Sequence, residues 1–343
     1  MEMKWFVALL MVVVMVCACW TGAAAENERD YQYALLDDGT IEITRYKGSA
    51  DRLAIPAKIA GKTVTSIRYS AFYSCDSLTS VSIPDSVEQI GTNLFVGCSK
   101  LKTISVSPDH PYFATIDGVL FRKADKALIS YPAGIKSSTY TIPQGIAVIG
   151  DSAFFACSSL TSVSVPDSVT SIGDLAFRFC DSLTSVSIPD SVEQIGTNPF
   201  ADCSALKTIS VSPEHLYFAT IDGVLFRKAD KALISYPAGI KSSTYTIPQG
   251  IASIGDYAFD SCTSLTSVSI PDSVTSIGDC AFGSCTSLTS VSIPDSVTSI
   301  GDYAFDNCPN PTLTVPRNSY AAEYAKTNNI PYTYPDANDW LNN

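Results

Sequence analysis

The chain has 343 residues, of which 46% are hydrophobic and only 16% are charged, a low charged fraction for a globular protein. Asp and Glu number 34 against 22 Lys and Arg, so the formal net charge is −12. An acidic surface repels nucleic acid, and this balance disfavours DNA or RNA as a partner. Only two histidines are present, which argues against a histidine-ligated metal centre and against a histidine-dependent catalytic triad.

The first 25 residues are typical of a secretory signal peptide. Lys4 precedes an apolar run from Trp5 to Val16, which is shorter than the about 20 residues that a membrane helix needs. Three alanines before Glu26 suit cleavage by signal peptidase. An alternative is lipid attachment at Cys19. No later segment is apolar enough to span a membrane, so the sequence predicts a secreted or cell-surface protein.

Eight cysteines mark a repeat along the rest of the chain. Neighbouring members of this set are 23 or 59 residues apart, at positions 75, 98, 157, 180, 203, 262, 285 and 308. Because 59 exceeds 23 by 36, two of the coils carry a 36-residue insert. Residues 112–147 are identical to residues 217–252, which indicates an internal duplication of a 105-residue unit.

One repeat unit shows how each coil is expected to fold. Leu265–Ile270 alternates like a short strand, and Pro271–Ser273 is a turn signal. Val274–Ile277 begins a second extended stretch, and Asp279 is placed to cap a short helical turn over 281–285. No single unit can bury its apolar face, so stacked coils must share one continuous core.

These units resemble the BspA-like class of leucine-rich repeats. Its pattern is a Cys, then Leu-x-x-Ile/Val-x-Ile-Pro, then Val-x-x-Ile-Gly-x-x-Ala-Phe, and the match covers roughly residues 30–335. The resemblance implies a β-rich α/β repeat solenoid of 23-residue coils, with short strands and one short helical turn per coil. It also implies adhesion to host matrix proteins, host cells or other microbes.

The two ends are predicted to be caps that cover the open core of the solenoid. Asp38-Gly39 is a hairpin signal near the start, and near the end 319–327 is predicted to be a helix and 330–334 a closing strand. The expected boundaries are a cap and a lengthened first coil over 26–70, the solenoid over 71–308 with inserts near 109–141 and 214–246, and a C-terminal cap over 309–343.

Each insert is predicted to be a β-meander with a basic turn. In the first copy, 113–116 pairs with 119–122, and the turn 123–126 leads to 127–132. The segment 112–147 has a net charge of +2, so two copies give +4 against −16 for the rest of the mature chain. Basic tips on an acidic rod would suit an acidic partner, and the candidate binding residues are Arg122, Lys123, Lys126, Arg227, Lys228 and Lys231.

The periodic cysteines are expected to form a ladder of buried thiols. They lack the Cys-x-x-Cys spacing of zinc sites. Coils stacked about 4.8 Å apart would bring them within disulfide range, yet equivalent residues point the same way into the core, where Cys acts as a small hydrophobe. Cys280 breaks the period and is expected to be partly exposed.

No catalytic residue, cofactor or metal is predicted. His110 and His215 occupy one position of the duplicated unit, so we expect both to be structural. Neither a Gly-x-Ser-x-Gly motif nor a glycine-rich phosphate loop occurs. The repeated Asp residues fit turns and caps, with a calcium ladder as an alternative.

The outward Ser and Thr residues are expected either to keep the solenoid soluble or to contact a repetitive surface such as ice or a glycan. Those on the predicted sheet are Ser82, Ser164, Ser187, Ser269 and Ser292.

The favoured function is extracellular binding by an adhesin-type interaction protein whose partners are extracellular proteins or glycans. The alternative is a structural envelope or matrix scaffold with no specific ligand, and an enzyme is disfavoured. Two surfaces are candidate ligand sites, namely the uniform sheet face and the two basic turns. The charge of the turns and their duplication favour the turns.

Overall fold

The computed structural model describes residues 28–309 and 311–335; the predicted signal peptide lies outside these residues. The described chain is a solenoid whose coils have three sides, namely a first-face strand, a second-face strand and a turn. In one coil these are β24 (Ser267–Ser269), β25 (Ser276–Ile277) and the turn over 280–285. Each side stacks on the same side of the next coil, because the apolar pattern repeats every 23 residues.

The strands of both faces form parallel ladders in register. Val268 of β24 lies opposite Val291 of β26, and Ile277 of β25 lies opposite Ile300 of β27. The first-face strands are β3 (Arg52–Ala54), β6 (Ser80–Ser82), β8 (Thr103–Ser105), β12 (Thr139–Thr141), β14 (Ser162–Ser164), β16 (Ser185–Ser187), β18 (Thr208–Ser210), β22 (Thr244–Thr246), β24, β26 (Ser290–Ser292) and β28 (Thr312–Thr314). The second-face strands are β7 (Gln89–Ile90), β13 (Val148–Ile149), β15 (Ser171–Ile172), β17 (Gln194–Ile195), β23 (Ser253–Ile254), β25 and β27 (Ser299–Ile300).

The third side of the coil is a tight turn where a helical turn was expected. Cys280 and Ser284 have φ angles of 50° and 55°, and a left-handed residue cannot continue an α-helix. The N–H groups of Cys280 and Phe282 instead donate to the carbonyls of Asp302 and Ala304 in the next coil, at 3.0 and 2.8 Å. We call these segments the ridge turns, and they comprise 70–75, 93–98, 152–157, 175–180, 198–203, 257–262, 280–285 and 303–308.

The Asp before each ridge turn also bridges coils and does not cap its own turn. The side-chain Oδ1 of Asp279 accepts the backbone N–H of Asp302 at 2.8 Å, and Asp256 accepts from Asp279 in the same way. The predicted capping role of Asp279 was therefore wrong. Among the described residues, no group of three or more His, Cys, Asp or Glu side chains is arranged to hold a metal ion.

The core is a column of aliphatic, aromatic and sulfur-containing side chains. Phe282 stacks between Phe259 and Phe305, with ring centroids 4.9 and 5.1 Å apart. The Cys285 thiol donates to the carbonyl of Phe259 at 3.0 Å. All nine described cysteines are free thiols. Seven of the eight periodic ones are buried, so the predicted ladder holds except at Cys308, which is partly exposed like Cys280.

Surface hydroxyls fasten neighbouring coils together. Thr289 Oγ1 donates to the carbonyl of Thr266 at 3.0 Å, and Ser296 Oγ donates to the carbonyl of Val274 at 2.7 Å. The outward serines of the first face align as expected, for example Ser269 beside Ser292. The abundance of Ser and Thr thus has a structural reason besides solubility.

The caps contain the elements expected from the sequence. After a short 3-10 helix (Glu28–Asp30), β1 (Tyr31–Leu35) and β2 (Ile41–Tyr46) form an antiparallel hairpin, and β4 (Lys58–Ile59) pairs with β5 (Lys62–Ile67). At the other end, Ser319 caps α1 (Tyr320–Thr327), and β29 (Tyr332–Thr333) pairs with β28. None of the described helices is long and apolar enough to cross a membrane.

Each insert is a meander that belongs to the second-face sheet. The first contains β9 (Phe113–Ile116), β10 (Val119–Arg122) and β11 (Ala127–Ser130), and β11 continues in parallel onto β13. The second repeats this with β19 (Phe218–Ile221), β20 (Val224–Arg227) and β21 (Ala232–Ser235), which continues onto β23. Phe121 and Leu128 are buried in the core, so the tips of the insert are its two turns, of which the one between β10 and β11 carries the basic residues.

Each insert lacks a ridge turn. Tyr131 takes the place of the ridge phenylalanine, because its N–H donates to the carbonyl of Ala153 at 2.7 Å and its ring stacks on Phe154 at 5.3 Å. The chain then returns directly to the first face, where the Gly134 N–H donates to the carbonyl of Leu101 at 2.7 Å. An insert therefore widens the strand faces but adds only the Tyr131 segment, without a full ridge turn, on the ridge side, so the solenoid bends toward the ridge.

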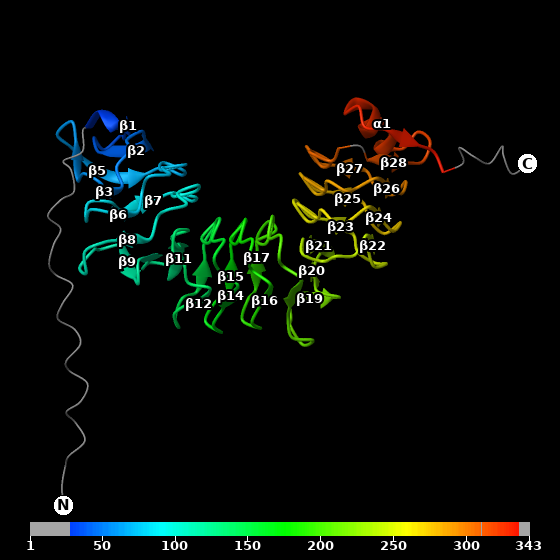
Figure 1. Cartoon of the computed structure of the whole chain (residues 1–343), viewed down its shortest axis with the longest axis horizontal. Helices are drawn as coiled ribbons and strands as arrows, with labels where there is room; N and C mark the ends of the chain where they lie inside the picture. The colour runs from blue at the N-terminus through cyan, green and yellow to red at the C-terminus, as the bar shows by residue number, and fades with distance from the viewer. Residues whose placement is uncertain (1–27, 310, 336–343) are drawn as a thin grey trace, which may run out of the picture.

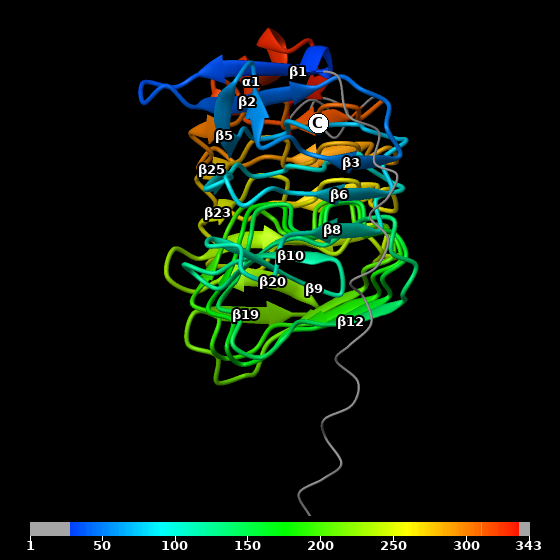
Figure 2. The ribbon, with the colours of Figure 1, turned by 90° about the vertical axis from the view of Figure 1, so that its left-hand side faces the viewer.

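The two bends divide the molecule into a first block (28–110), a middle block (131–215) and a third block (236–335). Figure 1 shows these blocks arranged as an arch, with the middle block joining the lower ends of the other two. Figure 2 shows β3, β6 and β8 of the first block stacked one above another. The hydrophobic core follows the same division, since its three clusters meet at the inserts.

Candidate binding surfaces

The two basic turns lie at the β10–β11 and β20–β21 connections. In the first turn the Arg122 guanidinium makes two hydrogen bonds to Asp125, with Nε–Oδ1 at 3.0 Å and Nη2–Oδ2 at 2.7 Å. The same pair recurs as Arg227 and Asp230, with Nη2–Oδ2 at 2.9 Å. The Arg122 guanidinium lowers the pKa of Asp125. Each arginine is thus paired within its own turn.

The lysines of the turns are exposed, but one of each pair has a partner. Lys123 Nζ donates to the backbone carbonyl of His110 at 2.6 Å, and Lys228 donates likewise to His215. Lys126 lies at the turn itself, with a φ angle of 54°. The structure brings the three predicted residues of each copy together on one turn, and the two turns belong to separate inserts.

His110, whose carbonyl accepts the Lys123 hydrogen bond, lies beneath the basic turn. It is fully buried; its Nδ1 accepts the N–H groups of Tyr112 and Phe113 at 3.2 and 3.3 Å, and its Nε2 donates to the carbonyl of Pro84 at 3.2 Å. Burial lowers the pKa of His110, which keeps the ring neutral. These contacts support the structural interpretation of this histidine, and His215 makes the matching ones.

The ridge turns form a second candidate surface, which the sequence reasoning missed. They lie on the inner side of the arch, because coils on the two sides of an insert contact each other directly there. At the first bend, Val96 of one block and Phe155 of the next line the same small cleft of about 20 Å³. At the second bend, the Asn198 side-chain amide donates to the carbonyl of Tyr257 at 2.7 Å.

Five aromatic and aliphatic side chains at or beside the ridge turns of the first and middle blocks are exposed or half-buried. Tyr69 and Tyr73 are 66% and 54% exposed, and Phe155 packs edge-on against Phe179 with ring centroids 5.3 Å apart. With Val96, these residues are named here the aromatic strip. In the sequence, the aromatic strip can be recognised by comparing equivalent positions of successive coils, because a search for motifs does not detect it.

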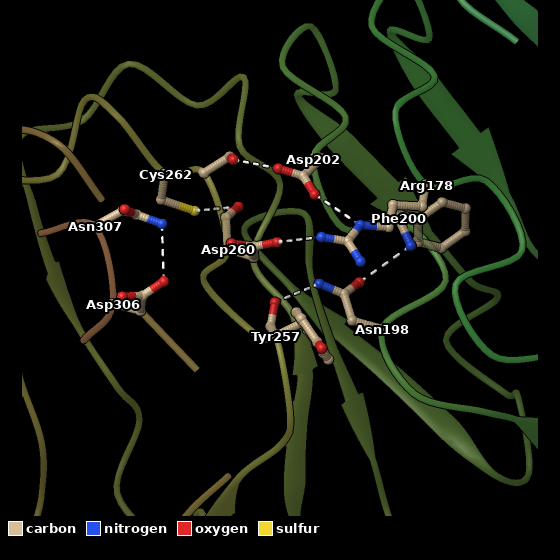
Figure 3. Close-up of polar contacts among 10 residues, drawn as sticks. Arg178, Asn198, Phe200, Asp202, Tyr257, Asp260, Cys262, Asp306 and Asn307 are labelled. Atoms are coloured by element: carbon tan, nitrogen blue, oxygen red, sulfur yellow. Dashed lines mark hydrogen bonds and ion pairs between the residues drawn. The ribbon is translucent and has the colours of Figure 1, made fainter. Parts of the chain in front are cut away.

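The second bend holds a charged cluster between the middle and third blocks (Figure 3). Arg178 Nε donates to Asp202 at 2.8 Å, and its Nη2 lies 3.8 Å from the carboxylate of Asp260. The guanidinium also lies over the rings of Phe179 and Tyr257. One cation thus faces two buried carboxylates at the contact between the blocks.

The protonation of this cluster follows from its burial. Asp260 is only 6% exposed. Burial and the neighbouring Asp202 carboxylate raise the pKa of Asp260 to about 8. Asp202 also accepts a hydrogen bond from Ser261 across the bend. The first bend has Tyr73, Gly97 and Phe155 at the positions equivalent to Arg178, Asp202 and Asp260, so it lacks this cluster.

Comparisons with known proteins agree with the repeat architecture. The chain matches the family model described as a BspA type leucine rich repeat region over residues 55–137, 133–245 and 236–322. It is 29% identical to a leucine rich cell surface protein from Faecalibacterium prausnitzii A2-165, with a TM-score of 0.45 and coverage of 89% of this chain and 97% of that chain. The pneumococcal vaccine antigen PcpA is 22% identical, with a TM-score of 0.50 and coverage of 84% and 80%, and it shares the fold. No curated protein matches the chain.

Proposed function

Because the chain belongs to the BspA-type leucine-rich repeat family, we propose that it is an extracellular binding protein, either secreted or retained at the cell surface. Its partners are host matrix proteins, host cells or neighbouring microbes. A leucine-rich repeat solenoid is a protein-interaction module, and the finer assignment as an adhesin rests on analogy with the family. The similar cell surface protein from Faecalibacterium prausnitzii supports the extracellular location.

One observation carries the proposal, namely that the chain presents the same exposed basic turn twice on a scaffold of net negative charge. Lys123 and Lys126 in one insert are matched by Lys228 and Lys231 in the other. Two identical contacts on one molecule can engage a multivalent acidic partner with avidity, although each single contact is weak. An acidic matrix protein or a sulfated glycan has this chemistry.

The test is binding of the mature protein to immobilised fibronectin, fibrinogen and sulfated glycans, with the variant K123E/K126E/K228E/K231E beside it. We expect the variant to lose affinity for the partner and to show a flatter salt dependence. The matched control is K102E/K136E/K207E/K241E, which makes the same change in net charge at exposed lysines away from the turns. Equal loss in both variants would show a general effect of charge and would contradict a site at the turns.

The second candidate function is a scaffold of the envelope or matrix without a specific ligand. Its support is the uniformity of the Ser- and Thr-rich first face, which repeats the same outward side chains along each block. Under this alternative the mature protein binds no component of the panel. Export itself is tested by the intact mass of the protein recovered from cells, and a cytosolic chain that retains Met1 would contradict both functions.

A further inference from the structure

Sequence differences between the two duplicated units are concentrated in the ridge turns. Residues 70–174 align with residues 175–279 without gaps, and long stretches such as 112–147 and 217–252 are identical. Most of the positions that differ lie in the ridge turns, namely Ser70, Tyr73, Ser74, Leu94, Val96, Gly97, Ser152, Phe155 and Ala156, with their counterparts 105 residues later.

This distribution is not explained by the fold. Core positions are constrained by packing, but the outward strand residues are not buried and are still nearly the same from coil to coil; Ser164, Ser187, Ser269 and Ser292 are examples. The ridge positions tolerate residues as different as Phe155, Arg178, Asp260 and Gly283 on the same backbone. The ridge is therefore the part of the solenoid in which the outward side chains differ from coil to coil.

The bends bring these individual side chains together. Because both bends close toward the ridge, residues from separate blocks meet on the inner side of the arch, as Val96 and Phe155 do at the first bend. A partner in this position contacts several different coils at once. The first-face sheet, by contrast, presents the same contact at every coil.

The aromatic strip has the composition of a protein-binding surface. Aromatic residues are enriched at the centres of interfaces and supply most of the binding energy there. Tyr69, Tyr73 and Phe155 are at least partly open to solvent, on a scaffold whose other outward residues are mainly Ser, Thr and Asp. The two exposed tyrosine rings and the half-buried Phe155 and Phe179 give an apolar surface of the kind that protein partners cover.

The charges around the strip define its partner. Asp151 and Asp174 directly precede two of its ridge turns, and Asp76 and Asp181 follow two of them. Of the bases close in sequence to its ridge turns, Arg68 is paired with Glu42 and Arg178 with Asp202, while Lys100 is exposed. The strip is thus apolar with an acidic border, and it complements an apolar segment flanked by basic residues.

We propose that the aromatic strip, formed by Tyr69, Tyr73, Val96, Phe155 and Phe179, binds a peptide segment of a partner protein that carries aromatic or aliphatic anchors flanked by Lys or Arg. This inference rests on the proposed function of extracellular binding and names a surface for it. The surface is distinct from the basic turns, whose partner must be acidic.

The experiment selects random phage-displayed peptides on the mature wild-type protein and measures the affinity of the enriched peptides for the variant Y73D/F155D/F179S. The substitutions introduce residues that the chain already has at equivalent ridge positions of another coil, Asp260 and Ser261. The fold should therefore be kept, and circular dichroism and thermal unfolding verify this. We expect enriched peptides to contain an aromatic or aliphatic anchor with flanking Lys or Arg and to lose about tenfold or more in affinity for the variant.

The control is K123E/K126E/K228E/K231E, which leaves the strip intact and should bind the enriched peptides as well as the wild type does. The inference is overturned if no peptide prefers the wild type to the strip variant, or if the enriched peptides are acidic and lose binding only in the lysine variant. If no peptide prefers the wild type, while binding of fibronectin, fibrinogen or sulfated glycans survives in the strip variant and is lost in the lysine variant, the strip is overturned and the proposed function stays in place. Peptide binding at the strip without binding to any of these matrix components would support the strip and contradict the adhesin assignment.

Discussion

The carboxylate of Asp279 accepts the backbone N–H of Asp302, one coil further along the chain, at 2.8 Å. Asp256 makes the same bond to Asp279, so Asp279 is both an acceptor and a donor in a column formed by Asp256, Asp279 and Asp302. The glycine before each aspartate leaves room for this bond, because a Cβ on Gly301 would lie 2.3 Å from Asp279 Oδ1 and 2.5 Å from Asp279 N.

The first prediction concerns this column. Replacing Asp279 by Ala removes the acceptor for the Asp302 N–H and should lower the free energy of unfolding by about 1 kcal/mol. Urea unfolding followed by circular dichroism measures the change. Asp272→Ala, at an exposed Pro-Asp turn, is the matched control and should change stability by less than about 0.5 kcal/mol.

A second prediction concerns the stacked rings. Phe282 is fully buried between Phe259 and Phe305, and Phe282→Ala should cost about 3–5 kcal/mol through the cavity that it leaves. Because repeat proteins couple mainly to nearest neighbours, hydrogen exchange should speed up most in the adjoining coils. A uniform increase that includes the first block would show that the arch unfolds as one unit and would contradict local coupling.

The third prediction is a pH dependence that originates at the second bend. The pKa of Asp260 is about 8 in the folded chain, against about 3.9 in an unfolded one. Between these values the folded state holds a proton that the unfolded state has released. Rising pH therefore lowers the free energy of unfolding across this window, by at most about 1.4 kcal/mol per pH unit.

Unfolding free energies of the wild type and of Asp260→Asn between about pH 5 and about pH 8 test this, because Asn cannot titrate and their difference isolates the carboxyl group. Asp306→Asn is the control, since Asp306 occupies the equivalent position in another coil and is exposed. A wild type whose stability runs parallel to that of Asp260→Asn at every pH would refute a protonated Asp260.

The fourth prediction concerns the thiols. Burial raises the pKa of Cys203 and Cys180 well above the ordinary value, and a protonated, inaccessible thiol reacts slowly. In the native protein, Cys280 and Cys308, which are only partly buried, should be alkylated first. After unfolding without reductant, all nine described cysteines should be modified, and mass spectrometry counts them. Recovery of disulfide-linked peptides would show instead that the ladder is covalent.

The sequence predicts those parts of the molecule that depend on periodicity. The spacing of Cys262 and Cys285 locates the coils, and the alternation of Leu265, Val268 and Ile270 locates a strand. Packing repeats with the same period, because each coil rests only on its neighbours. The terminal hairpin and helix were also predictable, since Asp38-Gly39 and Ser319 are local turn and cap signals.

The bends and the contacts across them could not be read in the same way. In each insert a tyrosine, Tyr131 in the first copy, takes the position of the ridge phenylalanine. The residues around Tyr131 do not resemble the Ala-Phe of the other coils, so the missing ridge turn could not be recognised from the sequence. Arg178 and Asp260 meet only because the insert between them adds no ridge turn. The partner of Asp279 lies in the next coil, so a local capping rule assigned its carboxylate to the wrong turn.

The identity of the two inserts makes the length of the arch adjustable in the gene. Recombination between the copies at 112–147 and 217–252 would remove 105 residues and leave no foreign junction, because the residues on both sides of the crossover are the same. The product would have one insert, and therefore one bend, and the reciprocal product would have three. Each event would also delete or add a complete set of ridge side chains, so the same exchange that changes the shape of the molecule would change its repertoire of contacts.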